Sequence, residues 1–299
     1  MGFINALPGA IAQGIIWGIM AIGVYITYKL LDMADLTVDG SICTGAAVCT
    51  MLVINGVNVW LAMIAALLAG MLTGLVTGLF HTAMGIPPIL AGILTQLMLW
   101  SVNLKILGKA NQGLSSRTYN VVITQLDRIA SIIILAGIVL VLIALLYWFF
   151  GTELGCSLRA TGCNINMSRA QGINTNMNKI LGLVISNGIV ALSGALLCQY
   201  QGFTDINMGR GAIVIGLAAV IIGEALFGKI ATNFALKLAS VVGGGIIYYI
   251  VYQTVIWIGL DTDLLKMLSA IVVAVFLAGP YWREKYFSKA VKKGGNANA

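Results

Sequence analysis

Long apolar runs, separated by short polar stretches, follow one another along almost all of the 299 residues. A helix of about 20 apolar residues crosses the hydrocarbon of a bilayer and satisfies its own backbone hydrogen bonds. The pattern therefore predicts an all-α, polytopic transmembrane helical bundle. The number of membrane segments is about 8–10, because some of the runs are short enough to be broken or re-entrant. The hydrophobic segments lie at about 10–31, 38–54, 58–80, 88–107, 129–150, 179–200, 206–226, 234–258 and 264–280.

The one sizeable polar segment between apolar runs is 151–178. It contains two similar four-residue sequences, RATG beginning at Arg159 and RAQG beginning at Arg169. Reversing the chain between two helices needs only a few residues. A long loop with short helix-and-break patterns, two cations and apolar side chains indicates instead a segment that docks onto a partner in the cytoplasm. The apolar side chains of the loop are Leu154, Leu158, Ile165 and Met167.

The composition agrees with lipid surroundings. Hydrophobic residues make up 60% of the chain and charged residues 9%, and the mean hydropathy is +0.98. Soluble domains carry about 25% charged residues. The formal net charge of +7 does not indicate a nucleic-acid partner, because a basic cluster follows the last apolar run and is typical of a cytoplasmic tail near lipid head groups. The cluster consists of Arg283, Lys285, Lys289, Lys292 and Lys293.

The distribution of basic residues predicts an orientation in the membrane. If 151–178 is cytoplasmic and every segment crosses, the N-terminus lies outside and the tail lies inside. More Lys and Arg residues then lie on the cytoplasmic side, as the positive-inside rule requires. The loop 105–128 weakens this bias, since it places Lys105, Lys109, Arg117 and Arg128 outside.

A single transmembrane domain is expected over 1–299. Its two halves contain a weak internal repeat, and we call the two copies the echo segments. ADLTVDGSICTGAA at 34–47 resembles TDINMGRGAIVIGLAA at 204–219. Five segments separate the copies, so they would be inverted, as in many transporters; the alternative is a coincidence between two Gly-rich segments. The paired glycines are Gly40 and Gly45, and Gly211 and Gly216. The expected parts are a first half (10–150), the cytoplasmic coupling loop (151–178), a second half (179–280) and the basic tail (281–299).

Polar and small residues open the second and seventh segments, and they are candidates for a translocation pathway. Polar groups inside apolar segments cost free energy unless they meet water, a partner or a substrate. Helix starts also offer N–H groups to a carboxylate. The alternative is that the two aspartates only cap their own helices. The candidates are Asp39, Gly40, Ser41, Thr44, Asp205, Asn207, Gly209, Arg210 and Gly211.

Two further groups of residues favour packing roles. Gly70, Gly74 and Gly78 share one helix face, which lets another backbone approach closely. Packing inside the bundle is the favoured interpretation, and a subunit interface is the alternative. Interhelical hydrogen bonds account for most of the further polar residues within or at the edges of the segments, which are Gln96, Asn103, Asn187, Gln199 and Glu224.

Residue patterns for catalysis, metal binding or nucleotide binding are missing. The five cysteines form no CxxC pair, and His81 is the single histidine. Neither an HExxH motif nor a GxxxxGK[ST] phosphate loop occurs. We therefore expect no catalytic residue, no metal and no cofactor in this chain. If ATP drives its function, another polypeptide binds the ATP.

Three stretches carry a resemblance to a known family. LRATGCNINMSRAQGIN (158–174), NKILGLVISNGIVALSGALLCQYQGF (178–203) and ADLTVDGSICTGAAV (34–48) resemble ABC-importer permeases of the branched-chain amino acid and ribose type. Within that family the chain is most similar to bacterial permeases that work with a lipoprotein receptor in aromatic amino acid uptake. The resemblance covers about 10–280 and implies a multi-pass subunit of an ATP-driven importer in a bacterial inner or plasma membrane.

The resemblance also implies partners and a coupling site. The partners are an ABC ATPase subunit, an extracytoplasmic substrate-binding lipoprotein, a second permease in a homodimer or heterodimer, and membrane lipid, with no nucleic acid. Residues 157–172 would form cytoplasmic coupling helices, and the alternative role for their arginines is positive-inside anchoring. The loop lacks the acidic residues that are common at equivalent positions in branched-chain transporters. The implied coupling residues are Leu158, Arg159, Ala160, Gly162, Met167, Arg169, Ala170 and Gly172.

Other functions remain open at this point. An ion-coupled secondary transporter would need an intramembrane carboxylate that titrates, such as Glu224. An intramembrane enzyme would need a convergent set of nucleophile or metal ligands. If the chain is an ABC permease, aromatic amino acids are the favoured cargo, and branched-chain amino acids, nucleosides and sugars are alternatives.

Overall fold

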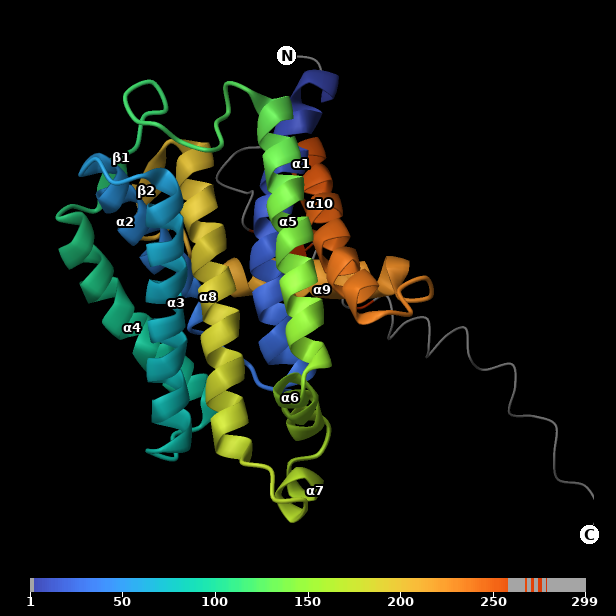
Figure 1. Cartoon of the computed structure of the whole chain (residues 1–299). Coiled ribbons are helices and arrows are strands. Elements are labelled where there is room, and N and C mark those ends of the chain that lie inside the picture. The colour runs from blue at the N-terminus through green and yellow to red at the C-terminus, as the bar shows by residue number, and fades with distance from the viewer. Residues whose placement is uncertain (1–2, 258–266, 268–269, 272–273, 276–277, 279–299) are drawn as a thin grey trace, which may run out of the picture.

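The computed structural model describes residues 3–257 and the positions 267, 270–271, 274–275 and 278. The ninth predicted segment (264–280) therefore lies largely outside the described residues, as does the basic tail (281–299). Within them the chain forms a bundle of helices, as predicted (Figure 1). The elements are α1 (Phe3–Tyr25), the π-helical turn η1 (Ile26–Leu30), α2 (Val38–Ile54), α3 (Val59–Thr82), α4 (Pro88–Leu107), β1 (Asn111–Gly113), α5 (Arg128–Gly151), α6 (Glu153–Cys163), α7 (Ile165–Ala170), α8 (Thr175–Gln201), β2 (Phe203–Asp205), α9 (Ala212–Phe227) and α10 (Phe234–Trp257).

Six of the described helices are long and apolar enough to cross a membrane. The shorter apolar helices are α2, with 17 residues, and α9, with 16. At 1.5 Å per residue these two helices are about 26 and 24 Å long, less than the hydrocarbon thickness of about 30 Å. Their shortness fits the expectation that some segments are broken or re-entrant. The six candidate spans are Ala6–Leu30, Val59–Thr82, Pro88–Leu107, Arg128–Gly151, Thr175–Gln201 and Phe234–Trp257.

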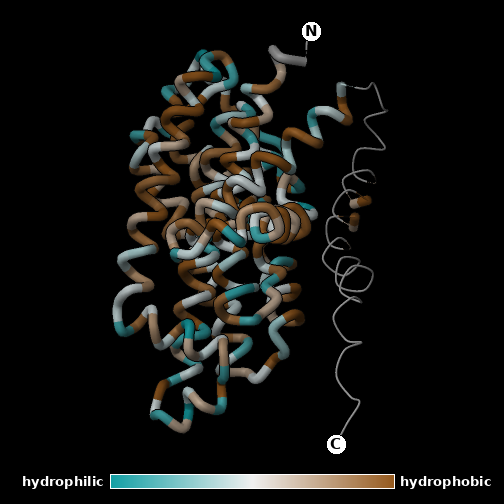
Figure 2. The backbone as a smooth tube through the Cα atoms, turned by 90° about the vertical axis from the view of Figure 1, so that its right-hand side faces the viewer, coloured by the Kyte–Doolittle hydropathy of each residue, from teal (hydrophilic) through white to brown (hydrophobic). Residues whose placement is uncertain are grey.

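The long helices run along one axis of the molecule, whereas α9 lies across its middle (Figure 1). Apolar residues predominate along the tube, as bilayer surroundings require (Figure 2). The helices α1 and α8 are largely buried inside the bundle. By contrast, α3, α4 and α5 present large apolar side chains outward, for example Leu61 and Leu140, which are 60% and 70% exposed. This outward apolar surface suits a lipid environment.

The glycine stripe of α3 packs inside the bundle. A Cβ added to Gly70 or Gly74 would meet the α8 backbone at Asn187 or Leu183, and one added to Gly78 would lie 3.1 Å from the Cα of Ile180. Small side chains let two helix backbones approach closely and gain dispersion contacts along their length. The structure thus confirms the packing interpretation of this stripe.

A two-stranded sheet of β1 and β2, which we call the clamp, lies at the end of the bundle opposite α6 and α7 (Figure 1). Strands β1 and β2 pair antiparallel, with Gln112 opposite Thr204. The N–H of Leu114 donates to the carbonyl of Gly202 at 2.8 Å, and the hydroxyls of Thr50 and Thr204 lie 2.6 Å apart. These bonds tie the chain after α4 to the chain after α8 and to α2.

Candidate functional site

The predicted docking loop folds into two short helices at one end of the bundle (Figure 1). The side chain of Thr152 accepts from the N–H of Gly155 and starts α6, and Asn164 accepts from the N–H of Met167 at 3.0 Å and starts α7. Such N-caps satisfy helix N–H groups that would otherwise lack partners. Gly172 has a φ of +78°, which favours glycine and turns the chain after α7. The loop is therefore an ordered structure built by local capping.

One face of α6 is fixed to the membrane helices. Leu158 is fully buried, and a Cβ added to Gly162 would meet the carbonyl of Leu30 at the end of η1. The Nδ2 of Asn178 in α8 donates to the Oγ1 of Thr161 at 2.9 Å, and Ser157 donates to the same asparagine at 3.4 Å. A movement imposed on α6 would therefore be passed to α1 and α8.

The two predicted coupling arginines differ in their surroundings. Arg159 is half-buried, donates to the carbonyl of Phe150 at 3.0 Å and lies 6.0 Å from the ring centroid of Phe234. It thereby satisfies a carbonyl at the C-terminus of α5, where a cation is favourable. Arg169 is exposed, and its Nε donates to Thr175 at 3.1 Å. Arg169 is thus the more accessible cation.

The predicted coupling residues separate into an inner and an outer set. Leu158 and Gly162 belong to the inner set, which packs on the bundle. The outer set is exposed to the surroundings and adds the apolar residue Leu154, which is 60% exposed. We call this outer set the coupling surface, and it consists of Leu154, Ala160, Met167, Arg169, Ala170 and Gly172.

The two echo segments of the sequence meet in the structure. The carboxylate of Asp39 in α2 accepts from the N–H of Gly211 and from the N–H of Ile213, both at 2.9 Å. It thus caps α9, a helix far along the chain, rather than α2. Gly209 lies against the backbone of Asp39, and its N–H donates to the sulfur of Cys43 at 3.1 Å. Because Asp39 occupies the start of α9, the expectation of free N–H groups there is wrong.

A cavity of about 210 Å³ lies beside this junction, between α2, α4 and the turn before α9. Asn103 lines it and is 1% exposed. Its Nδ2 donates to the carbonyl of Gly40 at 3.4 Å, and its Oδ1 is the one buried side-chain oxygen or nitrogen that has no partner within the described part of the chain. The cavity is lined by Asp39, Gly40, Cys43, Gln96, Leu97, Trp100, Asn103, Ile206 and Arg210.

The predicted pathway residues do not all reach this cavity. Asp39, Gly40 and Arg210 line it. Asp205 instead closes a local turn, accepting from the N–H of Asn207 at 2.7 Å. Four other predicted residues are buried in α2 or lie in the turn at the junction. Ser41 and Thr44 are buried by helix packing, and Gly209 and Gly211 form the turn that leads into α9.

Sequence reasoning missed Asp35 as a distinct site. This carboxylate is 3% exposed; it accepts from the N–H of Thr37 at 2.9 Å and from the Nδ2 of Asn187 at 2.7 Å. The Oδ1 of Asn187 accepts from Ser41 at 2.6 Å, and Ser41 lies 2.7 Å from the hydroxyl of Thr73. This chain of polar groups links α2, α3 and α8. A buried carboxylate needs such donors, because burial without them is costly.

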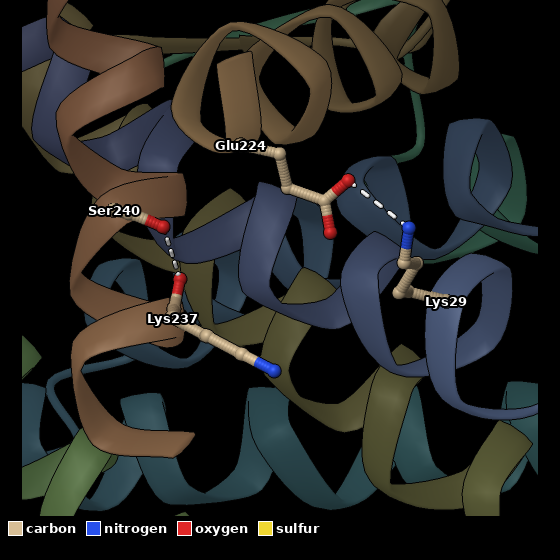
Figure 3. A network of polar contacts seen from close by, with 4 residues as sticks. All are labelled: Lys29, Glu224, Lys237 and Ser240. Atoms are coloured by element: carbon tan, nitrogen blue, oxygen red, sulfur yellow. Dashed lines mark hydrogen bonds and ion pairs between the residues drawn. The ribbon is translucent and has the colours of Figure 1, made fainter. Parts of the chain in front are cut away.

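Glu224, which ion coupling would require, forms an ion pair. Its Oε2 lies 3.1 Å from the Nζ of Lys29 at the end of η1 (Figure 3). The two side chains are 38% and 50% exposed. The pair joins α9 to the same end of α1 that contacts α6. Lys237 and Ser240 of α10 lie nearby (Figure 3).

Comparison with known proteins decides the family. Residues 7–277 match the family model described as the permease component of the branched-chain amino acid transport system. The chain belongs to this permease family. It is a transport component of the ABC class, a multi-pass membrane protein, and the predicted family is confirmed.

Two relatives illustrate the range of the family. A tyrosine transport system permease protein of Clostridioides difficile is 39% identical over 276 residues, which cover 92% of this permease and 91% of the relative. A fructose import permease protein of Bifidobacterium longum is 25% identical over 249 residues, covering 81% of this permease and 68% of the relative. An amino acid permease and a sugar permease are therefore both similar to it in sequence.

The fold also resembles solved structures. A metal-chelate type ABC transporter in an inward-facing conformation aligns with a TM-score of 0.52 at 15% identity, covering 93% of this permease and 85% of that chain. At this identity the likeness concerns the fold alone. The all-α bundle is thereby confirmed as that of an ABC transporter membrane subunit.

Proposed function

We propose that this permease imports an amino acid, with aromatic amino acids favoured, into a bacterial cell and is driven by a separate ATPase. The observation that carries the proposal is the family match over residues 7–277 together with the coupling surface on α6 and α7. The 39% identity to a tyrosine transport system permease supports the amino acid cargo. The distant sugar permease keeps sugars as an alternative.

The packing of α6 supports a role as a lever. Its inner face is fixed to η1 and α8 by Leu158, Gly162 and the bond from Asn178 to Thr161. An ATPase that binds the outer face of α6 and closes on ATP would therefore move η1 and α8 together with α6. Exposed Met167 offers an apolar contact and Arg169 a charged one. In this proposal the energy comes from the ATPase, and the permease itself hydrolyses nothing.

The orientation follows from this proposal. If α6 and α7 face the cytoplasm, the start of α1 and the clamp of β1 and β2 face outward (Figure 1). An extracytoplasmic lipoprotein receptor would then deliver solute at the clamp end. A second permease, as a homodimer, and membrane lipid would cover the apolar faces of the spans. The bacterial inner or plasma membrane is the proposed location.

Uptake in proteoliposomes tests the coupling role. We expect Arg169→Glu to lower ATP-driven uptake at least about tenfold, because reversing an interface charge removes an attraction and adds a repulsion. Arg159→Glu should also lower uptake, partly through the lost bond to Phe150. The matched control is Arg117→Glu, because Arg117 is exposed in the loop between β1 and α5, away from α6 and α7. Unchanged uptake by the double variant Arg159→Glu plus Arg169→Glu, with normal ATPase binding, would contradict the role.

An ion-coupled mechanism has less support. Glu224 is paired with Lys29 in the structure, so it is not an isolated intramembrane carboxylate. Uptake driven by a pH gradient, without ATP and by this chain alone, would establish that mechanism instead.

A further inference from the structure

We propose that the cavity beside the junction of α2 and α9 binds the zwitterionic head group of an amino acid, so that the permease itself selects its cargo. The inference rests on the proposed function, since it takes an amino acid as the solute. Three features of the cavity carry it: an unpaired cation, an unpartnered buried acceptor and an exposed aromatic side chain.

Arg210 supplies the cation. Its side chain is exposed at the cavity, and among residues 3–257 it forms no ion pair. A guanidinium presents paired N–H donors that match the two oxygens of a carboxylate. Because this cation lines the cavity without an ion pair to any described residue, a ligand carboxylate is a suitable partner for it. Arg210 therefore suits the carboxylate of the solute.

Asn103 and Asp39 supply acceptors for the ammonium group. Buried polar atoms without a hydrogen-bond partner are rare, and the Oδ1 of Asn103 is such an atom. Each carboxylate oxygen of Asp39 accepts a backbone N–H and retains a further acceptor position. An ammonium carries three N–H donors. It would thus satisfy Asn103 while Asp39 keeps its capping role.

The rest of the lining suits an aromatic side chain. Trp100 is 45% exposed and Leu97 65% exposed, and both line the cavity from α4. Aromatic rings stack or pack edge to face with a favourable free energy beyond simple burial. The volume of about 210 Å³ fits a small solute. The cavity therefore combines a polar head-group site with an aromatic neighbour.

Direct binding to the purified full-length permease tests the site in the absence of the receptor. The probes are the standard amino acids, L-tyrosine first, with two matched analogues. Tyramine lacks the carboxylate, and 3-(4-hydroxyphenyl)propionate lacks the ammonium. We expect L-tyrosine or another aromatic amino acid to bind, and each analogue to bind at least about tenfold more weakly, because each loses a charge-assisted hydrogen bond.

Two variants separate binding from folding. Arg210→Gln should weaken L-tyrosine at least about tenfold and leave tyramine unchanged, because tyramine has no carboxylate to lose. Asn103→Leu should weaken L-tyrosine and tyramine but leave 3-(4-hydroxyphenyl)propionate unchanged. A merely structural defect would weaken all three probes alike. The matched control is Arg117→Gln, which should bind every probe as the parent does.

The outcomes also separate this inference from the proposed function. The site is overturned if both analogues bind as well as L-tyrosine, if Arg210→Gln binds like the parent, or if no amino acid binds to a permease whose complex still imports solute. Loss of ATP-driven uptake of every solute in the full complex would instead overturn the proposed function. Binding that depends on both charged groups supports the site.

Discussion

At the scale of residues, the polar groups of the bundle have two different tasks. The network from Asp35 through Asn187 and Ser41 is enclosed and satisfied, and it fixes α2, α3 and α8 together. Asn103, by contrast, retains an unpartnered oxygen beside a cavity. Satisfied buried groups favour a structural role, and an unsatisfied one favours a ligand. This distinction depends on partners and therefore needs the structure.

Removing Asn187 should destabilise the bundle. Asn187→Ala takes one donor from the buried carboxylate of Asp35 and the acceptor from Ser41. Leaving a buried polar group unsatisfied costs about 1–3 kcal/mol, and more for a charged group. We expect a clear fall in the midpoint of thermal unfolding in detergent. Asn176→Ala, on the exposed surface of the same helix, is the control and should change little.

The ion pair of Glu224 should matter little for stability. Both partners are more than a third exposed, and such pairs contribute about 0–1 kcal/mol. Glu224→Gln should therefore keep ATP-driven uptake and nearly the same unfolding midpoint. Transport assays with an imposed pH gradient check the result. If the variant loses uptake that a pH gradient alone can drive, the permease is coupled to ions rather than to an ATPase.

At the scale of elements, small residues set how closely the helices approach. Gly74 touches the α8 backbone at Leu183, whereas Gly137 of α5 has nothing within 4 Å of an added Cβ. Gly74→Ala should push α3 away from α8 and lower the unfolding midpoint. Gly137→Ala should be neutral or stabilising by up to about 1 kcal/mol, because Ala favours helix over Gly. Equal effects of the two substitutions would mean that the close approach of α3 and α8 does not support the fold.

The sequence predicted the helices well where the ends of an apolar run coincide with the ends of a helix. The segments 38–54 and 88–107 coincide with α2 and α4. Hydrophobicity did not reveal that α9 begins only at Ala212, because the turn before it merges with the apolar run that was predicted from 206. The capping of α9 by Asp39 could not be predicted either. A carboxylate near a helix start looks like a local cap, and only the fold brings the two echo segments together.

The candidate site was predicted only in part, for the same reason. The resemblance identified the loop over 157–172, yet its inner residue Leu158 and its outer residue Met167 look equally apolar in the sequence. The structure separates them by burial. Asn103 and Gln96 were two of several polar residues within spans, and their meeting with Arg210 at one cavity depends on how α4 packs against α2.

At the scale of the whole molecule, the two ends of the bundle are expected to face different compartments. Native Cys156 and Cys163 are exposed on α6, whereas Cys43, Cys49 and Cys198 are buried. In a Cys156→Ser background, a membrane-impermeant thiol reagent should therefore label Cys163 in inverted vesicles but not in intact cells. Ser115→Cys, exposed at the clamp end, should show the opposite pattern once Cys156 and Cys163 are both replaced by Ser. Labelling of Cys163 from outside would reverse the orientation and remove the basis for cytoplasmic coupling.

Photo-cross-linking from the coupling surface tests the central claim most directly. A photoreactive residue in place of Met167 is expected to capture a protein that carries a GxxxxGK[ST] nucleotide-binding motif. The same residue in place of Thr118, exposed in the loop between β1 and α5, should capture no such protein. Capture of the ATPase from position 167 and not from 118 is the expected result. Active, ATP-driven complexes that yield no ATPase cross-link at 167, or that yield one at 118, would contradict coupling through α6 and α7.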